Sequence, residues 1–254
     1  MLRQKGERMM LGIVPCLDIQ DGKVVKGVQF EGLVALGDPL ALAERYAAQG
    51  ADMLAMLDIT ATIEGRETFY DLVRAVRSRI QIPLLVGGGL KDIEGMRRAR
   101  EAGADFLSVG SRAVEEPELI AKASETFGRE RVVVAIDAKR DEEAGMWRVV
   151  IRGGREKTSH DAVRFAQTMV AQGAGMILLT SIDRDGRRDG YDLALTQAVA
   201  QAVDVPVIAS GGAGEIEHFI ELKRHTRARY ALAASVFHRG ELTIPEIKQA
   251  LVAS

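Results

Sequence analysis

Two aspartates occupy equivalent positions at the ends of two similar apolar segments. Asp18 closes the segment 13–18, and Asp137 closes the segment 132–137. Both segments are short and rich in β-branched residues, which is typical of fully buried strands. Two carboxyl groups at one rim of a scaffold can divide general acid and general base work. For either aspartate alone, capping a loop or pairing with a lysine is the simpler interpretation, so the functional one depends on the rest of the chain.

Each half of the chain also carries a pair of segments suited to hold a phosphate. In the first half these are residues 87–89 and, one predicted strand later, 110–111; in the second half they are 210–212 and 234–235. Glycine lets backbone N–H groups approach an anion closely, and a following helix N-terminus favours negative charge. A tight turn explains either glycine pair by itself. The matched positions of the two pairs favour binding, and they predict an elongated substrate with a phosphate at each end.

Strand and helix patterns alternate along the whole chain and must position these residues. Predicted strands lie near 13–18, 53–58, 83–86, 105–109, 132–137, 175–180, 205–209 and 230–234. Helical patterns lie between them at 39–49, 68–79, 93–102, 117–127, 161–172, 193–203, 215–223 and 244–252. Eight β/α units in 254 residues match the size and alternation of a (β/α)8 TIM barrel, with a doubly wound open sheet as the rival. We predict a flexible leader over residues 1–10 and a single barrel domain over 11–254.

An internal repeat favours the closed barrel. Residues 82–89 (IPLLVGGG) recur as 205–212 (VPVIASGG), and the same shift relates 50–57 to 173–180. A repeat of four β/α units predicts two similar half-barrels. It places the two aspartates on opposite walls of the C-terminal mouth, where the active sites of TIM barrels lie.

Two loops at this mouth are longer than connectors need to be. Residues 22–37 carry Lys23, Lys26 and four glycines, and they could form a mobile lid that excludes water; a flexible surface loop is the rival interpretation. Residues 138–158 contain an apolar core at 147–152 followed by two glycines, which predicts a small hairpin.

Composition excludes several classes of function. A formal charge of −2 provides no basic face for nucleic acid, and no apolar run approaches the ~20 residues of a membrane span. The N-terminus has no apolar segment typical of a signal peptide, and the only cysteine, Cys16, lies in an apolar strand, so a cytoplasmic location is expected. The four histidines show no metal-binding spacing.

Several motifs resemble the cyclase-subunit family of imidazole glycerol phosphate synthase. They are PCLD at 15–18, GKVVKG at 22–27, LDIT at 57–60, AID at 135–137, TSIDRDG at 180–186, ASGGAG at 209–214 and AASVFH at 233–238. The resemblance extends from about residue 11 to 252. The segments 180–186 and 233–238 separate the chain from a sister barrel, the phosphoribosyl isomerase of the histidine pathway.

The resemblance implies a reaction and a set of site residues. Ammonia adds to the ribulosyl carbonyl of a phosphoribulosyl-formimino aminoimidazole carboxamide ribotide, and cleavage and ring closure yield imidazole glycerol phosphate and aminoimidazole carboxamide ribotide. The family's acid/base pair falls on Asp18 and Asp137, and its lid lysine falls on Lys26. Residues implied to bind the two phosphates or line the substrate are Gly89, Gly110, Ser111, Thr180, Asp185, Gly186, Ser210, Gly211, Gly212, Ala234 and Ser235. No metal or organic cofactor is expected.

Two departures from the family pattern stand out. Gly110-Ser111 replaces the usual Asn-Thr or Asn-Ser, so one side-chain amide is missing. At the opposite end of the barrel, the family's charged ring, which gates ammonia from a glutaminase partner, falls on Gly12, Met53, Phe106 and Met176. We expect an apolar plug or an altered interface there, with ammonia taken from solution or from a differently built partner. The alternative is that the ring has drifted and a heterodimer with a glutaminase still forms.

Other functions also fit these residues. A sugar-phosphate isomerase of the sister type, or a cyclase paralogue of another pathway, would use the same barrel, aspartates and phosphate sites. A non-catalytic subunit would use the apolar end for assembly alone, but the intact aspartate pair argues against it.

Overall fold

Eight parallel strands close into a barrel. The computed structural model describes residues 10–28, 31–59 and 63–254, and only the backbone of 26–28, 31–36 and 63–66; the predicted leader lies almost wholly outside the described residues. The barrel strands run in the order β10-β11-β12-β1-β4-β5-β6-β7, and β7 pairs with β10 to close the ring. Their bounds are β1 Gly12–Gln20, β4 Leu54–Asp58, β5 Leu84–Gly87, β6 Phe106–Val109, β7 Val132–Asp141, β10 Met176–Ser181, β11 Val207–Ser210 and β12 Tyr230–Ala233. The predicted TIM barrel is confirmed, and the open sheet is excluded.

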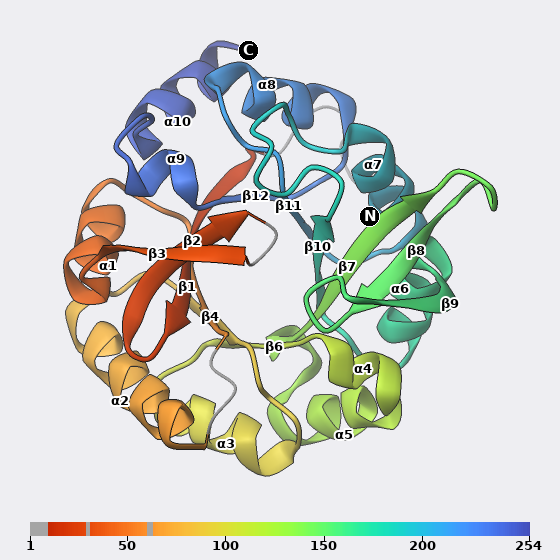
Figure 1. Ribbon diagram of the computed structural model, residues 1–254, viewed down its shortest axis with the longest axis horizontal. Coiled ribbons are helices and arrows are strands. Elements are labelled where there is room, and N and C mark those ends of the chain that lie inside the picture. Colours follow the sequence, from red (N-terminus) through yellow and green to blue (C-terminus); the bar gives the residue numbers. More distant parts are fainter. Residues whose placement is uncertain (1–9, 29–30, 60–62) are drawn as a thin grey trace, which may run out of the picture.

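Helices surround the ring of strands, as Figure 1 shows. Those that follow the barrel strands are α1 Pro39–Ala48, α2 Ile63–Arg79, α3 Ile93–Glu101, α5 Glu118–Phe127, α6 Ala162–Ala171, α7 Leu193–Ala202, α8 Ile216–His225 and α10 Ile244–Ala253. All eight predicted helices are confirmed. Two short helices were not predicted, α4 Ser111–Glu115 and α9 Ser235–His238, since four or five residues carry no helical periodicity. No helix in the described part of the chain is long and apolar enough to cross a membrane.

Aspartate caps start several helices and so fix where the loops at the mouth end. The side chains of Asp38, Asp92, Asp161 and Asp192 each accept a hydrogen bond from a backbone N–H in the first turn of the helix that follows. Each cap satisfies a donor that the helix itself leaves unpaired. Each of these caps fixes the residue at which the preceding loop ends, so the residues of that loop stay over the C-terminal end of the barrel.

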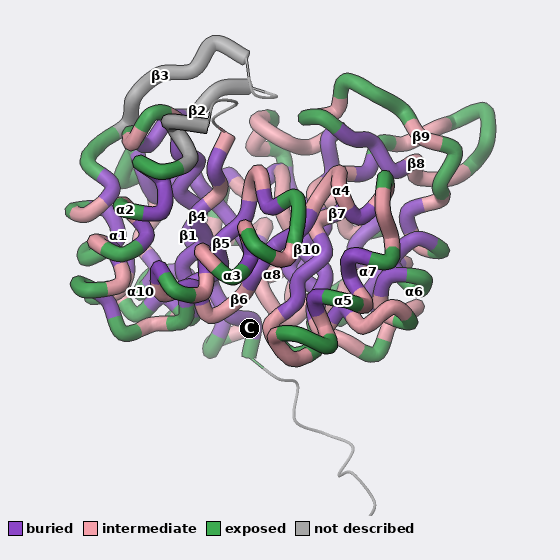
Figure 2. The backbone as a smooth tube through the Cα atoms, turned by 90° about the horizontal axis from the view of Figure 1, so that it is seen from below, coloured by how far each residue is buried: buried purple, intermediate pink, exposed green. Residues whose placement is uncertain are grey.

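The two long loops are both built from strands. β2 (Lys23–Val28) pairs antiparallel with β1 and with β3 (Glu31–Gly37), so the predicted lid segment is a hairpin in place of an irregular loop. The hairpin predicted over 138–158 is confirmed: β7 extends into an antiparallel ribbon with β8 (Met146–Ile151) and β9 (Glu156–Asp161). In side view, β8 and β9 lie at the end of the barrel away from the C-terminus (Figure 2).

Alternation along the strands determines which residues fill the barrel. In β1, Val14 and Cys16 belong to an apolar cluster inside the ring, and because side chains alternate in a strand, Asp18 continues the same inward series at its upper end. β7 repeats this inward series with Val133, Ala135 and Asp137. The interior is thus apolar toward the N-terminal ends of the strands, which form the lower end of the barrel, and polar at the C-terminal rim.

The lower end of the barrel is closed by apolar side chains. We call Gly12, Met53, Phe106, Met176 and Tyr230 the floor. Met53 and Met176 are buried members of the interior cluster, and Phe106 and Tyr230 pack against it. A Cβ on Gly12 would lie 2.5 Å from the ring of Tyr230, so the tyrosine ring occupies the space that a larger residue at position 12 would need.

Candidate active site

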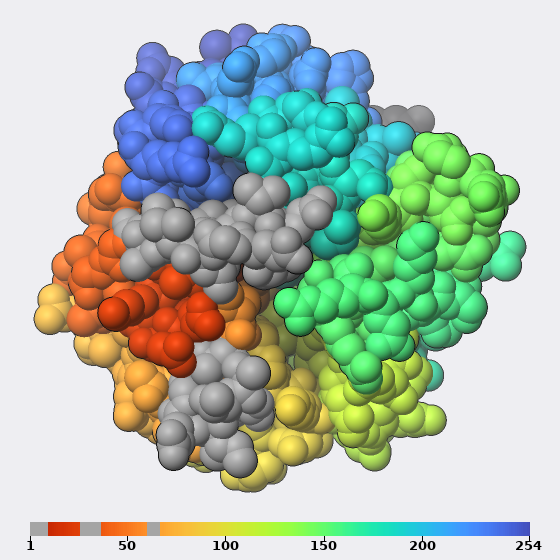
Figure 3. All heavy atoms as spheres, viewed as in Figure 1, coloured from red at the N-terminus to blue at the C-terminus, as the bar shows by residue number. Residues whose placement is uncertain are grey.

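A cavity of about 1440 Å³ lies at the C-terminal ends of the barrel strands. The face on which it opens is hollowed between the yellow segments of the first half and the green β8–β9 ribbon (Figure 3). The predicted site residues found in its lining are Asp18, Gly89, Gly110, Ser111, Asp137, Thr180, Asp185, Gly186, Ser210, Gly211, Gly212, Ala234 and Ser235. For Lys26, the backbone lies on β2, and its side chain lies outside the described residues.

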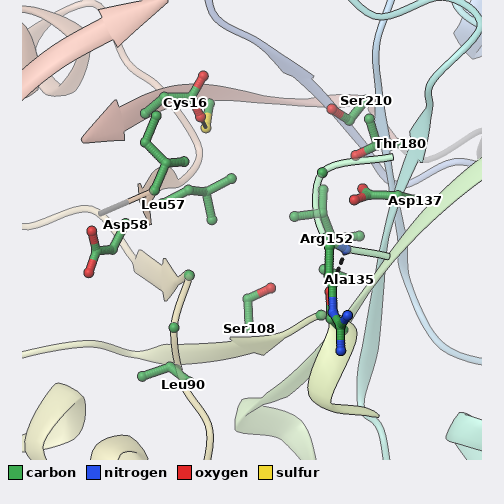
Figure 4. Close-up of a pocket in the computed structure, with 18 of the residues that line it drawn as sticks. Cys16, Leu57, Asp58, Leu90, Ser108, Ala135, Asp137, Arg152, Thr180 and Ser210 are labelled. Atoms are coloured by element: carbon green, nitrogen blue, oxygen red, sulfur yellow. Dashed lines mark hydrogen bonds between the residues drawn. The ribbon is translucent and has the colours of Figure 1, made fainter. Parts of the chain in front are cut away.

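The two aspartates face each other across this cavity. β7 is the fourth strand from β1 in either direction around the ring, so Asp18 and Asp137 come from opposite walls. Figure 4 shows the same separation, with Cys16 and Leu57 on one wall and Asp137, Thr180 and Ser210 on the other. A molecule bound across the mouth therefore has a carboxyl group on each side.

The surroundings of Asp137 raise the pKa of its carboxyl group. Burial, and secondarily the negative charge of Asp185, raise the pKa of Asp137 to about 6, although the Thr180 hydroxyl donates a hydrogen bond that favours the ionised form. At neutral pH a carboxyl with this pKa is about one-tenth protonated, compared with less than about one-hundredth for an ordinary aspartate. It can therefore donate a proton as well as accept one near neutrality.

Asp18 has a different environment. Its side chain is 6% exposed, and its Oδ1 accepts a hydrogen bond from the Cys16 thiol at 3.6 Å. The predicted core role of Cys16 is confirmed, because it is buried in the interior cluster, and it also forms part of the cavity wall.

We call residues 87–89 and 110–111 the first-half cradle and residues 210–212 and 234–235 the second-half cradle. The second-half cradle depends on backbone contacts that only glycine permits. The loop after β11 lies flat against the loop after β10. The Gly190 N–H donates to Gly212 O at 2.8 Å. A Cβ on Gly212 would lie 2.0 Å from Gly190 O, and one on Gly211 would lie 2.7 Å from Ser181 O. Both glycines have positive φ angles, so the segment 210–212 is shaped by close approach of two backbones.

The first-half cradle is connected to the β8–β9 ribbon. A Cβ on Gly88 would lie 2.0 Å from Asp58 O, and Gly89 has a φ of +65°. Ser111 Oγ accepts a hydrogen bond of 3.0 Å from the Arg152 N–H in the turn between β8 and β9, drawn in Figure 4. The Ser111 hydroxyl can still donate its own proton. The β8–β9 ribbon therefore orients a side chain that is predicted to bind phosphate.

Several residues of the lining were not predicted from the sequence. The basic ones are Lys91, Arg112, Lys122, Arg152, Arg155 and Arg188. Near the first cradle, Glu115 forms ion pairs with Arg112 and Arg152 at 3.3 Å each, and these hydrogen-bonded cations lower the pKa of Glu115. For Arg152, Arg155 and Arg188, the sequence signal is the high content of glycine and arginine in 152–155 and 184–190. That content is also typical of a solvated loop.

The described residues contain no group of three or more His, Cys, Asp or Glu side chains arranged to hold a metal ion. The chemistry that this arrangement supports is proton transfer by two separated carboxyl groups. It would act on a substrate whose two ends lie in glycine-rich backbone cradles.

The chain is similar to known proteins over most of its length. The family model for histidine biosynthesis proteins matches residues 12–243. The chain is 52% identical over 237 residues to the imidazole glycerol phosphate synthase subunit HisF of Anoxybacillus flavithermus, covering 93% of this chain and 94% of the relative. It is 53% identical over 239 residues to the HisF of Myxococcus xanthus and 49% identical over 256 residues to that of Methanopyrus kandleri, covering 94% of each chain in both cases. The chain belongs to the histidine biosynthesis protein family and, within it, is similar over nearly its whole length to HisF subunits.

Proposed function

We propose that the chain is a cytoplasmic cyclase that forms imidazole glycerol phosphate and aminoimidazole carboxamide ribotide from a phosphoribulosyl-formimino aminoimidazole carboxamide ribotide and ammonia. The observation that carries this proposal is the placement of two carboxyl groups on opposite walls of one cavity, between two glycine-rich cradles. A substrate with a phosphate at each end would place one phosphate in each cradle and its reacting centre between the carboxyl groups. The names of the relatives, which are about half identical, support the reaction.

The two cradles would fix the ends of the substrate. Backbone N–H groups near Gly89, Gly110 and Ser111 would hold one phosphate, and those near Gly186 and Gly212, with Ser235, would hold the other. Donors held by backbone geometry are already oriented before the anion arrives, so binding them costs little reorganisation. The central, reacting part of the substrate then lies between Asp18 and Asp137.

The carboxyl groups would move the protons that the reaction requires. Ammonia adds to a ketone carbon, and water then leaves from the adduct. The new nitrogen next attacks the formimino carbon, and the ribotide amine leaves from that carbon. Each departure needs a proton on the leaving group, and each attack needs a proton removed from nitrogen. We assign the acid role to Asp137, because its pKa of about 6 keeps a protonated fraction near neutrality, and the base role to Asp18.

An ammonia-dependent assay tests the proposal. The purified chain, the substrate and an ammonium salt should together give loss of substrate absorbance and formation of both products. Turnover of a sugar phosphate without ammonia would identify an isomerase of the sister type. Absence of any turnover, combined with tight binding to another protein, would identify a non-catalytic subunit.

Substitution of either aspartate tests the residue roles. Asp18→Asn and Asp137→Asn should each lower kcat by about 10²- to 10⁴-fold, the usual contribution of a general acid or base, with KM changed little. Steady-state kinetics and circular dichroism on the same samples separate lost chemistry from lost folding. Near-normal rates for either variant would contradict its assigned role.

The source of ammonia is a separate question, because the relatives are named as subunits. The floor of this barrel carries Met53, Phe106, Met176 and Tyr230, with no charged side chain among them. We propose that this floor is an apolar plug and that ammonia enters from solution at the mouth. In a mixture with a glutaminase subunit, glutamine should then give no more product than the free ammonia it releases. Efficient glutamine-dependent turnover that added scavengers of ammonia leave unchanged would refute the plug.

A further inference from the structure

The loop between β10 and α7 contains three arginines whose surroundings differ. Arg184 and Arg187 each form an ion pair with Asp189, at 3.2 Å in both cases. Arg188 instead lines the cavity and forms an ion pair with Glu241, in the loop that follows α9. The first two arginines therefore neutralise a carboxylate of their own loop, and Arg188 alone of the three is presented to the substrate side.

The second-half cradle is bordered by one acidic and one basic side chain of the described lining. Among the described cavity-lining residues that follow β10, β11 and β12, Arg188 is the basic one, and Asp185 is acidic. The repulsion that Asp185 exerts on Asp137 shows that its negative charge is felt across this wall. A dianionic phosphate placed beside Asp185 would meet the same repulsion unless a cation offsets it.

One donor of the Arg188 guanidinium has no hydrogen-bond partner among the described atoms. The ion pair with Glu241 uses Nη2, whereas Nε is buried and has no hydrogen-bond partner among the described atoms. A buried N–H without a partner costs free energy in the unliganded protein, and that cost is recovered when an acceptor arrives. The planar guanidinium places Nε–H in a fixed direction, which suits an oxygen of a phosphate.

The backbone at this position is held in an uncommon conformation. Arg188 has a φ of +62°, in the left-handed region that disfavours residues with a side chain. The backbone of Gly214 packs closely against it, since a Cβ on Gly214 would lie 2.3 Å from Arg188 O. Unfavourable conformations of this kind persist where the surrounding structure imposes them, and they occur most often at functional sites.

We propose that Arg188 is a phosphate-binding side chain of the second-half cradle, with its guanidinium as the donor group and Glu241 holding that group in place. This inference rests on the proposed function, because it concerns the same cavity. It adds a residue and a charge that the backbone cradle lacks. The ligand class is a phosphate monoester, for which inorganic phosphate serves as the simplest probe.

Direct titration with inorganic phosphate, by calorimetry at constant ionic strength, tests the proposal without any turnover. The chain should bind two phosphates. Arg188→Gly should weaken one of these sites by about tenfold or more, and Arg188→Lys should lie in between, because it keeps the charge but not the guanidinium. Glycine accommodates a φ of +62° without strain, so this variant should fold. Arg187→Ala is the matched control, and it should bind phosphate like the parent chain.

Kinetics provide the second readout. Arg188→Gly should raise KM by about tenfold and leave kcat nearly unchanged, because a phosphate contact acts equally on the bound substrate and on the transition state. Unchanged phosphate affinity in Arg188→Gly would overturn the assignment. An equal loss in Arg187→Ala would also overturn it, since that result indicates a general effect of loop charge. If the parent chain shows no cyclase turnover, the calorimetry still decides on Arg188, so the two proposals fail separately.

Discussion

At the scale of single residues, the two aspartates differ although their strands are alike. Asp137 lies beside Asp185 and Thr180, and its pKa is raised to about 6; Asp18 lies beside the thiol of Cys16. The sequence predicts both positions, since each closes an apolar strand. It could not predict the raised pKa of Asp137, because desolvation and repulsion arise from residues distant in the chain.

The acid role of Asp137 predicts a pH dependence. Activity that needs protonated Asp137 should fall as pH rises through its pKa, which in the complex lies at or above about 6, because bound phosphates add negative charge. Asp185→Asn removes a neighbouring negative charge, so it should lower this pKa and move the alkaline limb of kcat to lower pH. A limb that stays in place or moves upward in Asp185→Asn would contradict the assignment.

Burial of Asp137 also predicts a pH-dependent cost in stability. The folded-state pKa of about 6 lies above the ordinary aspartate value of 3.8, so protonation favours the folded state. The stabilisation is complete below the unfolded pKa and is lost as pH rises through about 6. Asp137→Asn lacks this titrating group, so its free energy of unfolding should rise relative to that of the parent chain as the pH increases. The gain between pH 4 and pH 8 should be up to about 3 kcal/mol. Urea unfolding at the two pH values measures this, and a difference independent of pH would refute it.

At the scale of elements, the loops were harder to predict from the sequence than the strands and long helices that they connect. The strands and long helices follow from alternation and periodicity in the sequence. The short helices α4 and α9 did not, and neither did the positions of Arg152 and Arg188, because an exposed arginine in a glycine-rich loop is normally solvated. Contacts between loops, such as the Gly190–Gly212 hydrogen bond, decide these positions, and contacts of this kind are not encoded in local sequence patterns.

The contact between the loops after β10 and β11 predicts the effect of a single methyl group. Gly212→Ala would place its Cβ 2.0 Å from Gly190 O at a φ of +102°, so it should separate the two loops, raise KM and cost more than about 2 kcal/mol of stability. Gly240→Ala is the control, since Gly240 also has a positive φ, +67°, but nothing within 4 Å. It should cost only about 1 kcal/mol and leave KM unchanged. Equal effects of the two substitutions would contradict the close-approach argument.

At the scale of the whole molecule, the apolar floor lies at one end of the barrel axis and the candidate catalytic residues lie at the other end. The internal repeat in the sequence was enough to predict closure and to place the two carboxyl groups on opposite walls. It could not show that Tyr230 fills the space beside Gly12, because the two positions belong to different halves of the chain. The apolar floor and the polar mouth are the two ends of one inward-facing series of side chains.

This separation predicts that the floor can be altered without affecting the chemistry. Met176 lies four residues before Thr180 on β10, about 13 Å lower along the strand. Met176→Ala should therefore cost about 2–5 kcal/mol of stability, as large-to-small core substitutions do, with kcat/KM for ammonia-dependent turnover within about twofold of the parent. Denaturant unfolding and the ammonia assay measure the two effects, and a large loss of kcat/KM in a folded variant would show that the two ends are coupled.

The two cradles also differ in a way that gives the mouth a direction. Two similar half-barrels would, by themselves, accept an elongated bisphosphate in either orientation, and only one orientation brings the reacting carbonyl to the correct carboxyl group. One end is bordered by the linked ion pairs of Glu115 with Arg112 and Arg152, and the other by Asp185 and Arg188. We therefore expect unequal charge at the two ends to let a pseudo-symmetric scaffold distinguish the head of its substrate from the tail.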